Sequence, residues 1–192
     1  MDAAAYDARL QELWRRNWPA GVSPDLSYPF GEIPLGDYLR RRAAESPDKP
    51  ALIFYGTVVT YAELDRLSDA CAALLHEHGA RPGDRIAVFL QSSPQFVVAF
   101  YGILKLGCVH VPVNPMFREH ELEYELNDTD AEIIIAQDTL VDLVSAVKAR
   151  TSIRTVFSTS LAEMLPAAPT LPLPAGIDQP PVAHADAIDF LP

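Results

Sequence analysis

Cysteine, lysine and long apolar runs are scarce in this chain of 192 residues. The two cysteines, Cys71 and Cys108, are too few for a disulfide framework, and each lies in an apolar stretch that predicts a small core residue in a reducing compartment. No run approaches about 18 uncharged apolar residues, so we expect no membrane-spanning helix. The first residues, which include Asp2 and Asp7, lack the apolar segment of a signal peptide. These absences predict a cytoplasmic protein.

Basic residues are also few, because 15 lysines and arginines stand against 26 aspartates and glutamates, for a formal net charge of −11. Proteins that bind nucleic acids neutralise phosphates with clustered basic residues, so we expect no nucleic-acid partner. Apolar residues are abundant and make up 49% of the chain. This length and composition predict one globular domain, or one domain plus a tail, with a core that needs no disulfide staples.

The residue pattern divides the chain into three parts. Residues 5–18 carry apolar side chains at helical spacing, and the four prolines within 19–34 favour an extended arm, so residues 1–34 are predicted to be a helix and an arm. Residues 35–165 alternate short apolar strands with helices. Residues 166–192 contain 7 of the 17 prolines and lose all periodicity, which predicts an extended segment.

The middle part predicts an α/β fold. Two short strands around Gly56 form a hairpin, and Thr60 with Glu63 three residues later forms a capping box that starts a helix. Pro112 lacks an amide donor, which places its strand at an edge or a bulge. Helices of about 10–15 residues between the later strands require a mostly parallel sheet with helices on both faces. The expected strands are 51–54, 58–61, 86–90, 109–113, 133–136 and 156–157, and the expected helices are 35–45, 61–78, 94–106, 118–127 and 140–148.

A search for catalytic patterns finds none. The chain has no G-x-x-x-x-G-K-[ST] or G-x-G-x-x-G phosphate loop and no G-x-S-x-G nucleophile elbow. His76 and His78 lie two positions apart on a helix and point in different directions, so they cannot bind one metal ion. His110 is expected to have a hydrogen-bonded place in the core or at an interface. We therefore assign no catalytic, cofactor-binding or metal-binding residue.

The charged and polar clusters are interpreted as surface features. The acidic residues within 119–132 are scattered around a helix and predict a solvated face rather than a metal site. The consecutive arginines 40–42 are expected to pair with nearby acids at the surface. The polar turn of residues 91–94 is expected to cap a helix.

Two stretches nevertheless resemble the signatures of one enzyme family. Residues 59–64 (VTYAEL) resemble the first signature of the adenylate-forming, or AMP-binding, superfamily, [LV]-[TS]-Y-x-E-L, and residues 104–115 resemble the second, L-K-x-G-x-x-x-x-P-[IVL]-[ND]-P. Residues 47–52 and 81–88 are also typical of this family, in the expected order and spacing. The signature residues are expected to have structural roles: Thr60, Tyr61, Glu63, Leu64, Lys105, Gly107 and Pro112.

The resemblance implies the N-terminal portion of an acyl-CoA synthetase, and the Trp-rich opening with residues 28–31 favours a fatty-acid–CoA ligase. Such a parent enzyme joins a medium- or long-chain fatty acid to coenzyme A, using ATP and Mg²⁺, through an acyl-adenylate, and releases AMP and pyrophosphate. The family's phosphate-binding loop and catalytic residues lie beyond position 192. The chain alone is therefore expected to be inactive, with the remainder of the polypeptide as its partner. The resemblance also allows peripheral membrane association of the parent.

Other interpretations stay open at this point. The chain is alternatively a non-enzymatic α/β interaction module, or part of the adenylation domain of a peptide synthetase or of an aryl-CoA ligase. The α/β alternation alone also permits a flavodoxin-like receiver or nucleotide domain, but the turns after Leu90 and Val113 lack the acidic cluster or Gly-rich loop of such a domain. A truncated α/β body leaves apolar surface uncovered, which predicts a homodimer through that surface.

Overall fold

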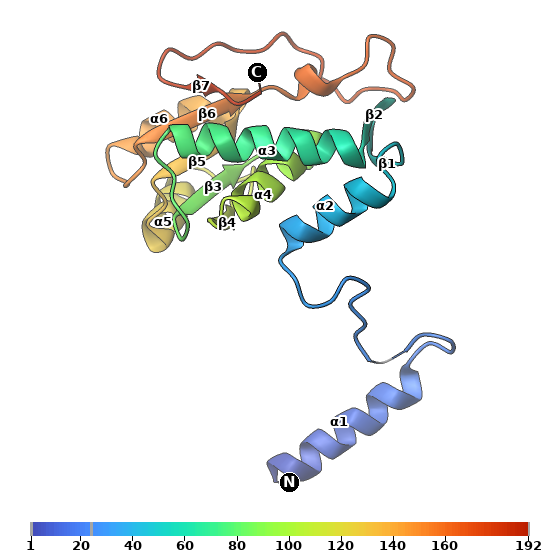
Figure 1. Cartoon of the computed structure of the whole chain (residues 1–192). Coiled ribbons are helices and arrows are strands. Elements are labelled where there is room, and N and C mark those ends of the chain that lie inside the picture. Colours follow the sequence, from blue (N-terminus) through green and yellow to red (C-terminus); the bar gives the residue numbers. More distant parts are fainter. Residues whose placement is uncertain (1, 24, 192) are drawn as a thin grey trace. The chain divides into compact units, whose positions relative to one another are not determined.

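The computed structural model describes residues 2–23 and 25–191. It forms two compact units, residues 1–33 and residues 34–192, which we describe separately. The first unit contains α1 (Ala3–Asn17), coloured blue in Figure 1. Asp2 caps this helix, because its carboxylate accepts a hydrogen bond from the Ala5 amide at 2.7 Å. The helix therefore begins two residues earlier than its apolar periodicity predicts.

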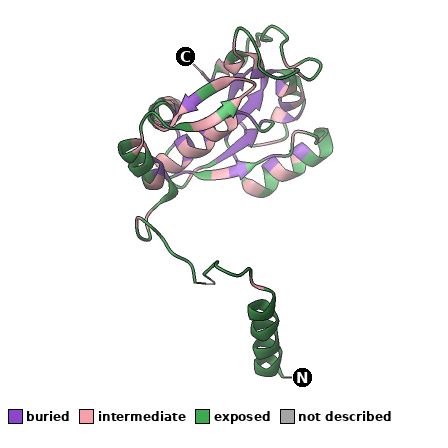
Figure 2. Cartoon of the chain, turned by 90° about the vertical axis from the view of Figure 1, so that its right-hand side faces the viewer, coloured by how far each residue is buried: buried purple, intermediate pink, exposed green. Residues whose placement is uncertain are grey.

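The apolar stripe of α1 is present and stays largely exposed. No residue of α1 is buried, and Figure 2 shows the helix in the colour of exposed residues. The Trp14 and Trp18 rings lie 5.6 Å apart, and the Trp18 indole N–H donates to the Val22 carbonyl at 2.9 Å. This hydrogen bond turns the start of the arm back toward the end of the helix.

The second unit begins with α2 (Leu35–Glu45), followed by an antiparallel hairpin of β1 (Pro50–Phe54) and β2 (Thr57–Thr60). The turn residues Tyr55 and Gly56 have φ angles of 51° and 112°. Two successive residues with positive φ match the twist of a tight hairpin, so the predicted turn at Gly56 is confirmed.

The main sheet has five strands, all paired in parallel, in the spatial order β4-β3-β5-β6-β7. They are β3 (Arg85–Phe89), β4 (Val109–Pro112), β5 (Ile133–Gln137), β6 (Thr155–Thr159) and β7 (Ile188–Asp189). β4 lies at one edge, so Pro112 has the edge position that its missing amide donor predicts.

Helices cover both faces of this sheet, as Figure 1 shows. One face carries α3 (Tyr61–Glu77) and α4 (Pro94–Lys105), and the other carries α5 (Glu119–Thr129) and α6 (Val141–Lys148). Alternate strand residues enter separate cores: Ile133 and Ile135 pack with α3 and α4, whereas Ile134 packs with α5 and α6. The predicted α/β class, with a mostly parallel sheet, helices on both faces and a small hairpin, is confirmed.

The largest difference from the sequence prediction lies in the proline-rich segment, where no strand is expected. Ile188 and Asp189 form β7 beside β6, and Phe190 is buried against α3 and α4. A two-residue strand has no periodicity of its own, so only its pairing with β6 reveals it. Smaller differences lie at element ends: the strand expected over 58–61 ends at Thr60, and the helix expected from residue 140 follows a short 3-10 helix (Asp138–Leu140).

Candidate functional site

The first signature connects the hairpin to α3. Thr60 is the last residue of β2 and the N-cap of α3: its hydroxyl accepts from the Glu63 amide at 3.2 Å, while the Glu63 carboxylate accepts from the Thr60 amide at 2.8 Å. The hydrogen bond from the Thr60 backbone lowers the pKa of Glu63. Tyr61 is partly buried against the core, and Leu64 is fully within it. This signature therefore fixes where the helix begins.

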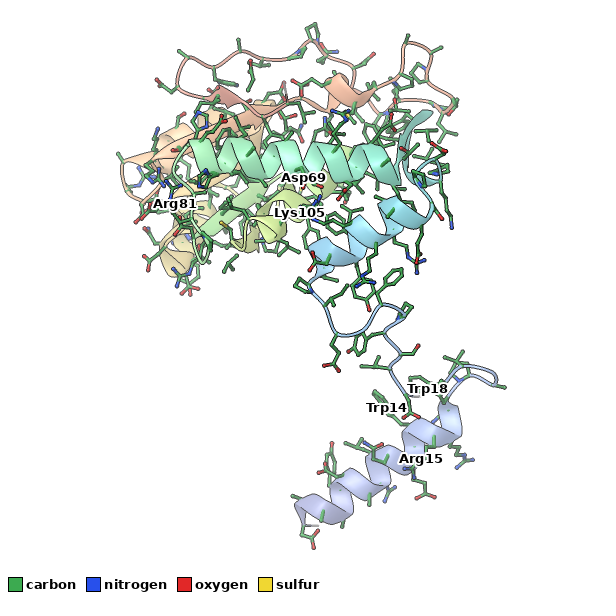
Figure 3. The ribbon with its side chains drawn as sticks, in the orientation of Figure 1. Trp14, Arg15, Trp18, Asp69, Arg81 and Lys105 are labelled. Atoms are coloured by element: carbon green, nitrogen blue, oxygen red, sulfur yellow. The ribbon has the colours of Figure 1, made fainter. Side chains whose placement is uncertain are left out.

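The lysine of the second signature joins helices far apart in sequence. Lys105, the last residue of α4, donates from Nζ to the Asp65 carboxylate at 2.5 Å, to the Asp65 carbonyl at 2.9 Å and to the Asp69 carboxylate at 2.9 Å. Its side chain is only 2% exposed, and all three ammonium hydrogens have acceptors. Arg40 of α2 donates two hydrogen bonds to the same Asp69. Figure 3 labels Lys105 and Asp69 at this junction of α2, α3 and α4.

The electrostatics of this junction favour the ionised carboxylates. Burial raises the pKa of Asp69, but the hydrogen bonds from Lys105 and Arg40 outweigh burial, so the pKa lies below its usual value. The pairing of Arg40 with Asp69 also agrees with the predicted role of that arginine as a partner for nearby acids. Lys105 therefore joins the helices of this junction and has no N–H left to donate to a further group.

Two glycines allow the helices at this junction to approach closely. A Cβ atom on Gly102 of α4 would lie 2.7 Å from the Cys71 Cβ and 3.1 Å from the Ser68 carbonyl of α3. A Cβ atom on Gly36 of α2 would lie 3.0 Å from the Lys105 side chain. The short separation between these helices therefore depends on the absence of side chains.

The remaining residues of the second signature shape the turn from α4 to β4. Gly107 has a φ of 79°, and its carbonyl accepts from the Gly83 amide at 2.8 Å. The Cys108 thiol contacts the Arg81 carbonyl at 3.1 Å, so the turn after α4 is fastened to the turn that precedes β3. This arrangement places Pro112 opposite Val88 at the edge of the sheet. The signature residues thus lie at the start of α3, in the core, at a helix junction, in a turn and in the edge strand β4.

Polar groups gather instead at the carboxyl ends of the strands. Ser93 follows β3 and caps α4 by accepting from the Phe96 amide at 3.3 Å, as predicted for this turn. Gln95 is fully buried and donates to the Ser160 carbonyl beyond β6 at 2.7 Å. Among the described residues, its Oε1 and that of Gln137 at the end of β5 are buried without a hydrogen-bond partner. Ligands of parallel α/β sheets bind at this edge, where the strand order reverses between β3 and β5.

Sequence reasoning did not select Gln95, Gln137 or Asp138. The available signal was their position, because each polar residue lies just after a buried parallel strand or at the start of the following helix. Asp138 is buried, and its carboxylate accepts from the amides of Thr139 and Val182. The hydrogen bonds of these three side chains are to backbone groups and to the Thr139 hydroxyl, so this edge contains polar groups suited to recognition.

The histidines and acidic residues of the described chain are not grouped in a way that could hold a metal ion. Within residues 2–23 and 25–191, no group of three or more histidine, cysteine, aspartate or glutamate side chains is placed to hold a metal ion. The Nδ1 of His78 lies 2.9 Å from the Leu74 carbonyl, so this ring nitrogen is engaged within its own chain segment. Two of the acidic residues of α5, Glu119 and Glu123, pair with Arg150. The described residues therefore do not form a cage for Mg²⁺.

His110 has a packing role rather than the hydrogen-bonded role expected from the sequence. Its ring lies edge-to-face between Phe96 at 5.5 Å and Phe100 at 5.2 Å, and its Nε2 is buried without a partner among the described residues. Burial lowers the pKa of His110 and so favours the neutral imidazole. The prediction of a hydrogen bond at this position was wrong, because two aromatic rings of α4 cover the ring.

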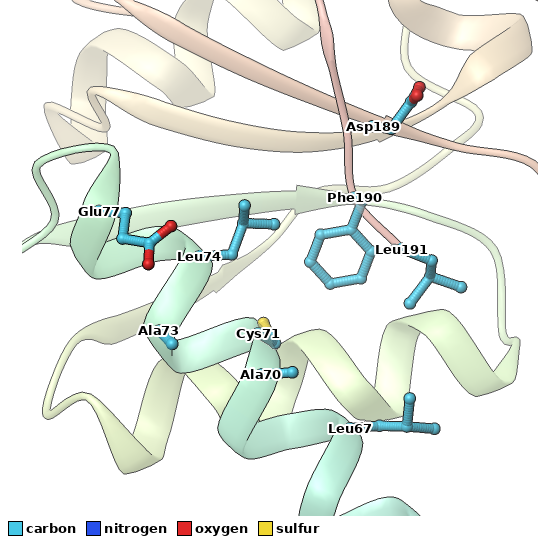
Figure 4. Close-up of a pocket in the computed structure, with 9 residues that line it drawn as sticks. All are labelled: Leu67, Ala70, Cys71, Ala73, Leu74, Glu77, Asp189, Phe190 and Leu191. Carbon is cyan, nitrogen blue, oxygen red and sulfur yellow. The ribbon is translucent and has the colours of Figure 1, made fainter.

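An apolar pocket of about 300 Å³ lies between α3 and the end of β7. Figure 4 shows the Phe190 ring lying between Leu191 and the α3 residues Leu74 and Cys71. The other lining residues are Leu67, Ala70, Ala73, Glu77 and Asp189.

Within the described part of the chain, no helix has the length and apolar character needed to cross a membrane.

Comparison with known proteins agrees with these observations. The family model for AMP-binding enzymes matches residues 39–188. The long-chain-fatty-acid–CoA ligase of Bacillus subtilis is 36% identical over 158 residues, which is 81% of this chain and 28% of that protein. The 4-coumarate–CoA ligase 2 of rice is 37% identical over 121 residues, which is 62% of this chain and 21% of that protein.

Solved structures give the same result. A long-chain-fatty-acid–CoA ligase from Archaeoglobus fulgidus superposes with a TM-score of 0.66 and 26% identity, over 71% of this chain and 29% of that chain. This chain thus spans 28% of the length of the Bacillus subtilis ligase, 21% of the rice ligase and 29% of the Archaeoglobus fulgidus structure. The expected resemblance is confirmed by a family match that covers most of the α/β unit, including both signatures. The chain belongs to the family of AMP-binding enzymes.

Proposed function

We propose that this chain forms the N-terminal scaffold of an ATP-dependent fatty-acid–CoA ligase. The observation that carries the proposal is the 36% identity to a long-chain-fatty-acid–CoA ligase over 81% of the chain. Both signatures lie inside the matched region, where they fix the hairpin, the α2–α3–α4 junction and the turn into β4. A scaffold with these fixed points suits a large enzyme whose reacting groups come from further segments.

The proposed reaction has two steps. A carboxylate oxygen of the fatty acid attacks the α-phosphorus of ATP, which breaks the bond to the β-phosphate and releases pyrophosphate. The thiolate of coenzyme A then attacks the acyl carbonyl, and AMP leaves with the electron pair of the broken C–O bond. When bound, Mg²⁺ would stabilise negative charge on the phosphates.

We assign no step of this reaction to a side chain of the described residues. They offer no metal cage, and Lys105 already uses all its donors within the α2–α3–α4 junction. In our proposal the chain supplies the rigid sheet, and its carboxyl edge, with Ser93 and Gln95, faces the region where substrates are handled. ATP, Mg²⁺, coenzyme A and the fatty acid are therefore ligands of the whole enzyme in this proposal.

An aryl substrate is the second candidate, because 4-coumarate–CoA ligase 2 of rice is 37% identical over 62% of the chain. Fatty acids and aromatic acids share the carboxylate that reacts. They differ in the remaining group, an alkyl chain or an aromatic ring, which the substrate pocket must accommodate. The non-enzymatic interaction module remains a third outcome for the test.

Self-association is a further part of the proposal, since Ile53 and Val58 pair across the hairpin with side chains exposed.

The experiment compares two polypeptides from the same gene: the 192-residue chain and the longest protein that the reading frame encodes. Each is incubated with ATP, Mg²⁺, coenzyme A and either palmitate or 4-coumarate, and acyl-CoA is measured by mass spectrometry and pyrophosphate by a coupled assay. We expect palmitoyl-CoA from the longer protein and neither product from the 192-residue chain. Preference for 4-coumarate would favour the aryl candidate.

Two outcomes contradict the proposal. If the reading frame stops after residue 192 and its protein forms no product, the interaction module is favoured. Pyrophosphate release by the 192-residue chain would show that it is catalytic by itself.

Light scattering after gel filtration tests self-association. We expect a concentration-dependent dimer that the double variant Ile53→Ser, Val58→Thr weakens, whereas a monomer at all concentrations would contradict this part.

A further inference from the structure

A second pocket lies where α2, β1, the start of α3 and α4 meet, in the region where Figure 1 shows α2 and the hairpin beside α3. Its volume of about 330 Å³ falls within the range of about 300–1000 Å³ that is typical of small-molecule sites. Its apolar lining includes Leu39 of α2 and Val97 of α4. Three tyrosines also line it, so we call it the tyrosine pocket: Tyr38, Tyr61 and Tyr101.

Two of these tyrosines supply hydrogen-bond donors. Tyr61, the first residue of α3, and Tyr101 of α4 are partly buried and pack against the core. Within the described part of the chain, neither hydroxyl has a hydrogen-bond partner on another residue. Burial, with a smaller effect from the neighbouring Tyr61, raises the pKa of Tyr101, so this hydroxyl keeps its hydrogen at neutral pH. The pocket therefore offers donors to a ligand that carries a hydrogen-bond acceptor.

The charge of the lining favours an anion as that acceptor. Of the described residues that line the tyrosine pocket, Arg42 carries the only formal charge. It also pairs with Glu45 at 3.4 Å, but the guanidinium group has five N–H donors and can contact a second acceptor. The pocket beside β7 has the opposite sign, because its charged lining residues are Glu77 and Asp189. The two apolar pockets therefore select for head groups of different charge.

We propose that the tyrosine pocket binds a small amphiphile that carries a carboxylate. The apolar body of this ligand contacts the aliphatic lining, and its carboxylate accepts hydrogen bonds from the tyrosine hydroxyls and is attracted by Arg42. A neutral head group loses the attraction of the guanidinium group, and a cationic head group is repelled by it. The proposal does not rest on the ligase activity, because it concerns binding by this chain alone.

The test is a titration of the ¹⁵N-labelled 192-residue chain with octanoate, octanol or octylammonium at neutral pH, followed by NMR of the backbone amides. The three probes share one alkyl chain and differ in the charge of the head group. We expect octanoate to shift the amides of Leu39, Leu52 and Tyr101, which line the tyrosine pocket. The amides of Ala73 and Leu74 line the pocket beside β7, so they serve as an internal control and should not shift with octanoate.

Matched variants assign the binding to the polar groups of the pocket. Tyr101→Phe keeps the ring and removes the hydroxyl, so we expect octanoate to bind about two- to tenfold more weakly. Arg42→Gln should weaken octanoate binding by about two- to fivefold, since the guanidinium group is partly exposed, and should leave octanol binding unchanged. Tyr124→Phe changes an exposed tyrosine of α5 in the same way and should have no effect. The spectrum of each variant also shows whether it is folded.

The order of affinities decides the outcome. We expect octanoate to bind about two- to fivefold more tightly than octanol, and octylammonium to bind most weakly. If octanoate binds no more tightly than either of the other two probes, or shifts no amide around the tyrosine pocket, the proposal is wrong. Unchanged octanoate binding in both Tyr101→Phe and Arg42→Gln would likewise overturn it. None of these measurements uses ATP or coenzyme A, so the result is separate from the test of the ligase reaction.

Discussion

Lys105 of α4 and Asp65 of α3 form an ion pair of 2.5 Å although 40 positions separate them in the chain. The lysine is buried, whereas the Asp65 side chain is 22% exposed and Asp69, its second partner, is 45% exposed. Burial of the cation is therefore compensated by two carboxylates that still contact water. This pairing gives the lysine of the second signature a specific structural role, the fastening of α3 to α4.

Replacing this lysine should destabilise the α/β unit. Removal of one partner of a buried ion pair costs about 3–5 kcal/mol, and the exposure of the carboxylates reduces that cost, so we expect Lys105→Met to lower the free energy of unfolding by about 1–3 kcal/mol. Urea denaturation followed by circular dichroism measures the change. The matched control is Arg40→Gln, which breaks an exposed pair with Asp69 and should cost at most about 1 kcal/mol. Equal stability of wild type and Lys105→Met would contradict the assigned role.

Asp69 should make stability depend on acid pH. Its folded-state pKa lies below the ordinary value because the hydrogen bonds from Lys105 and Arg40 outweigh burial. Its contribution is therefore complete above the unfolded-state pKa of about 4 and is lost as the pH falls through the lower folded-state pKa. We expect Asp69→Asn to be less stable than wild type at pH 6, with a difference that shrinks below pH ~4. Urea midpoints at several pH values check this, and a constant difference would show that Asp69 does not titrate as inferred.

Gly102 should not tolerate a methyl group. An alanine Cβ would lie 2.7 Å from the Cys71 Cβ, and overpacking of this kind costs about 1–3 kcal/mol, part of which the better helix propensity of alanine offsets. We expect Gly102→Ala to be less stable by about 1–2 kcal/mol in urea denaturation. The double variant with Cys71→Gly removes the nearest obstructing side chain and leaves the Ser68 carbonyl at 3.1 Å, so the cost of Gly102→Ala should be smaller in that background. An unchanged cost there would place the strain elsewhere.

Both cysteines should be unreactive in the folded chain. Burial raises the pKa of Cys71 to about 12 and that of Cys108 to about 11, so the reactive thiolate is rare at neutral pH. We expect 5,5′-dithiobis(2-nitrobenzoate) to react with neither thiol rapidly at pH 8 and with both after addition of guanidinium chloride. Cys71→Ser and Cys108→Ser assign any signal to its residue. Rapid reaction of one thiol in the native protein would show that its surroundings open to solvent.

Local signals made much of the fold predictable. The capping box at Thr60 and Glu63 depends on residues three positions apart, and the tight turn at Tyr55 and Gly56 depends on positive φ angles at two neighbouring residues. Pro112 marked an edge strand because a missing amide donor is a property of the residue itself. The surroundings of the His110 ring were harder to predict, because its hydrogen bonding depends on which aromatic rings of α4 lie against it.

The candidate site was less predictable than the fold. Gln95 and Gln137 belong to different elements, and their unpartnered oxygens lie near the same edge of the sheet only after β3, β5 and β6 have paired. His184 and Asp138 are 46 positions apart, and nothing in the spacing between them indicates a contact. Polar residues after buried strands were the one available signal.

Sequence alone determined the class of the fold, the order of its helices and strands and the family resemblance, because apolar periodicity, caps and short signatures are properties of neighbouring residues. Tertiary structure decided the spatial order of the strands, the strand β7 within the proline-rich segment, the ion pairs of Lys105 and the contact of His184 with the Asp138 carbonyl. These features form only when the folded chain brings together residues that are distant in sequence, and no local pattern records which partner each will meet.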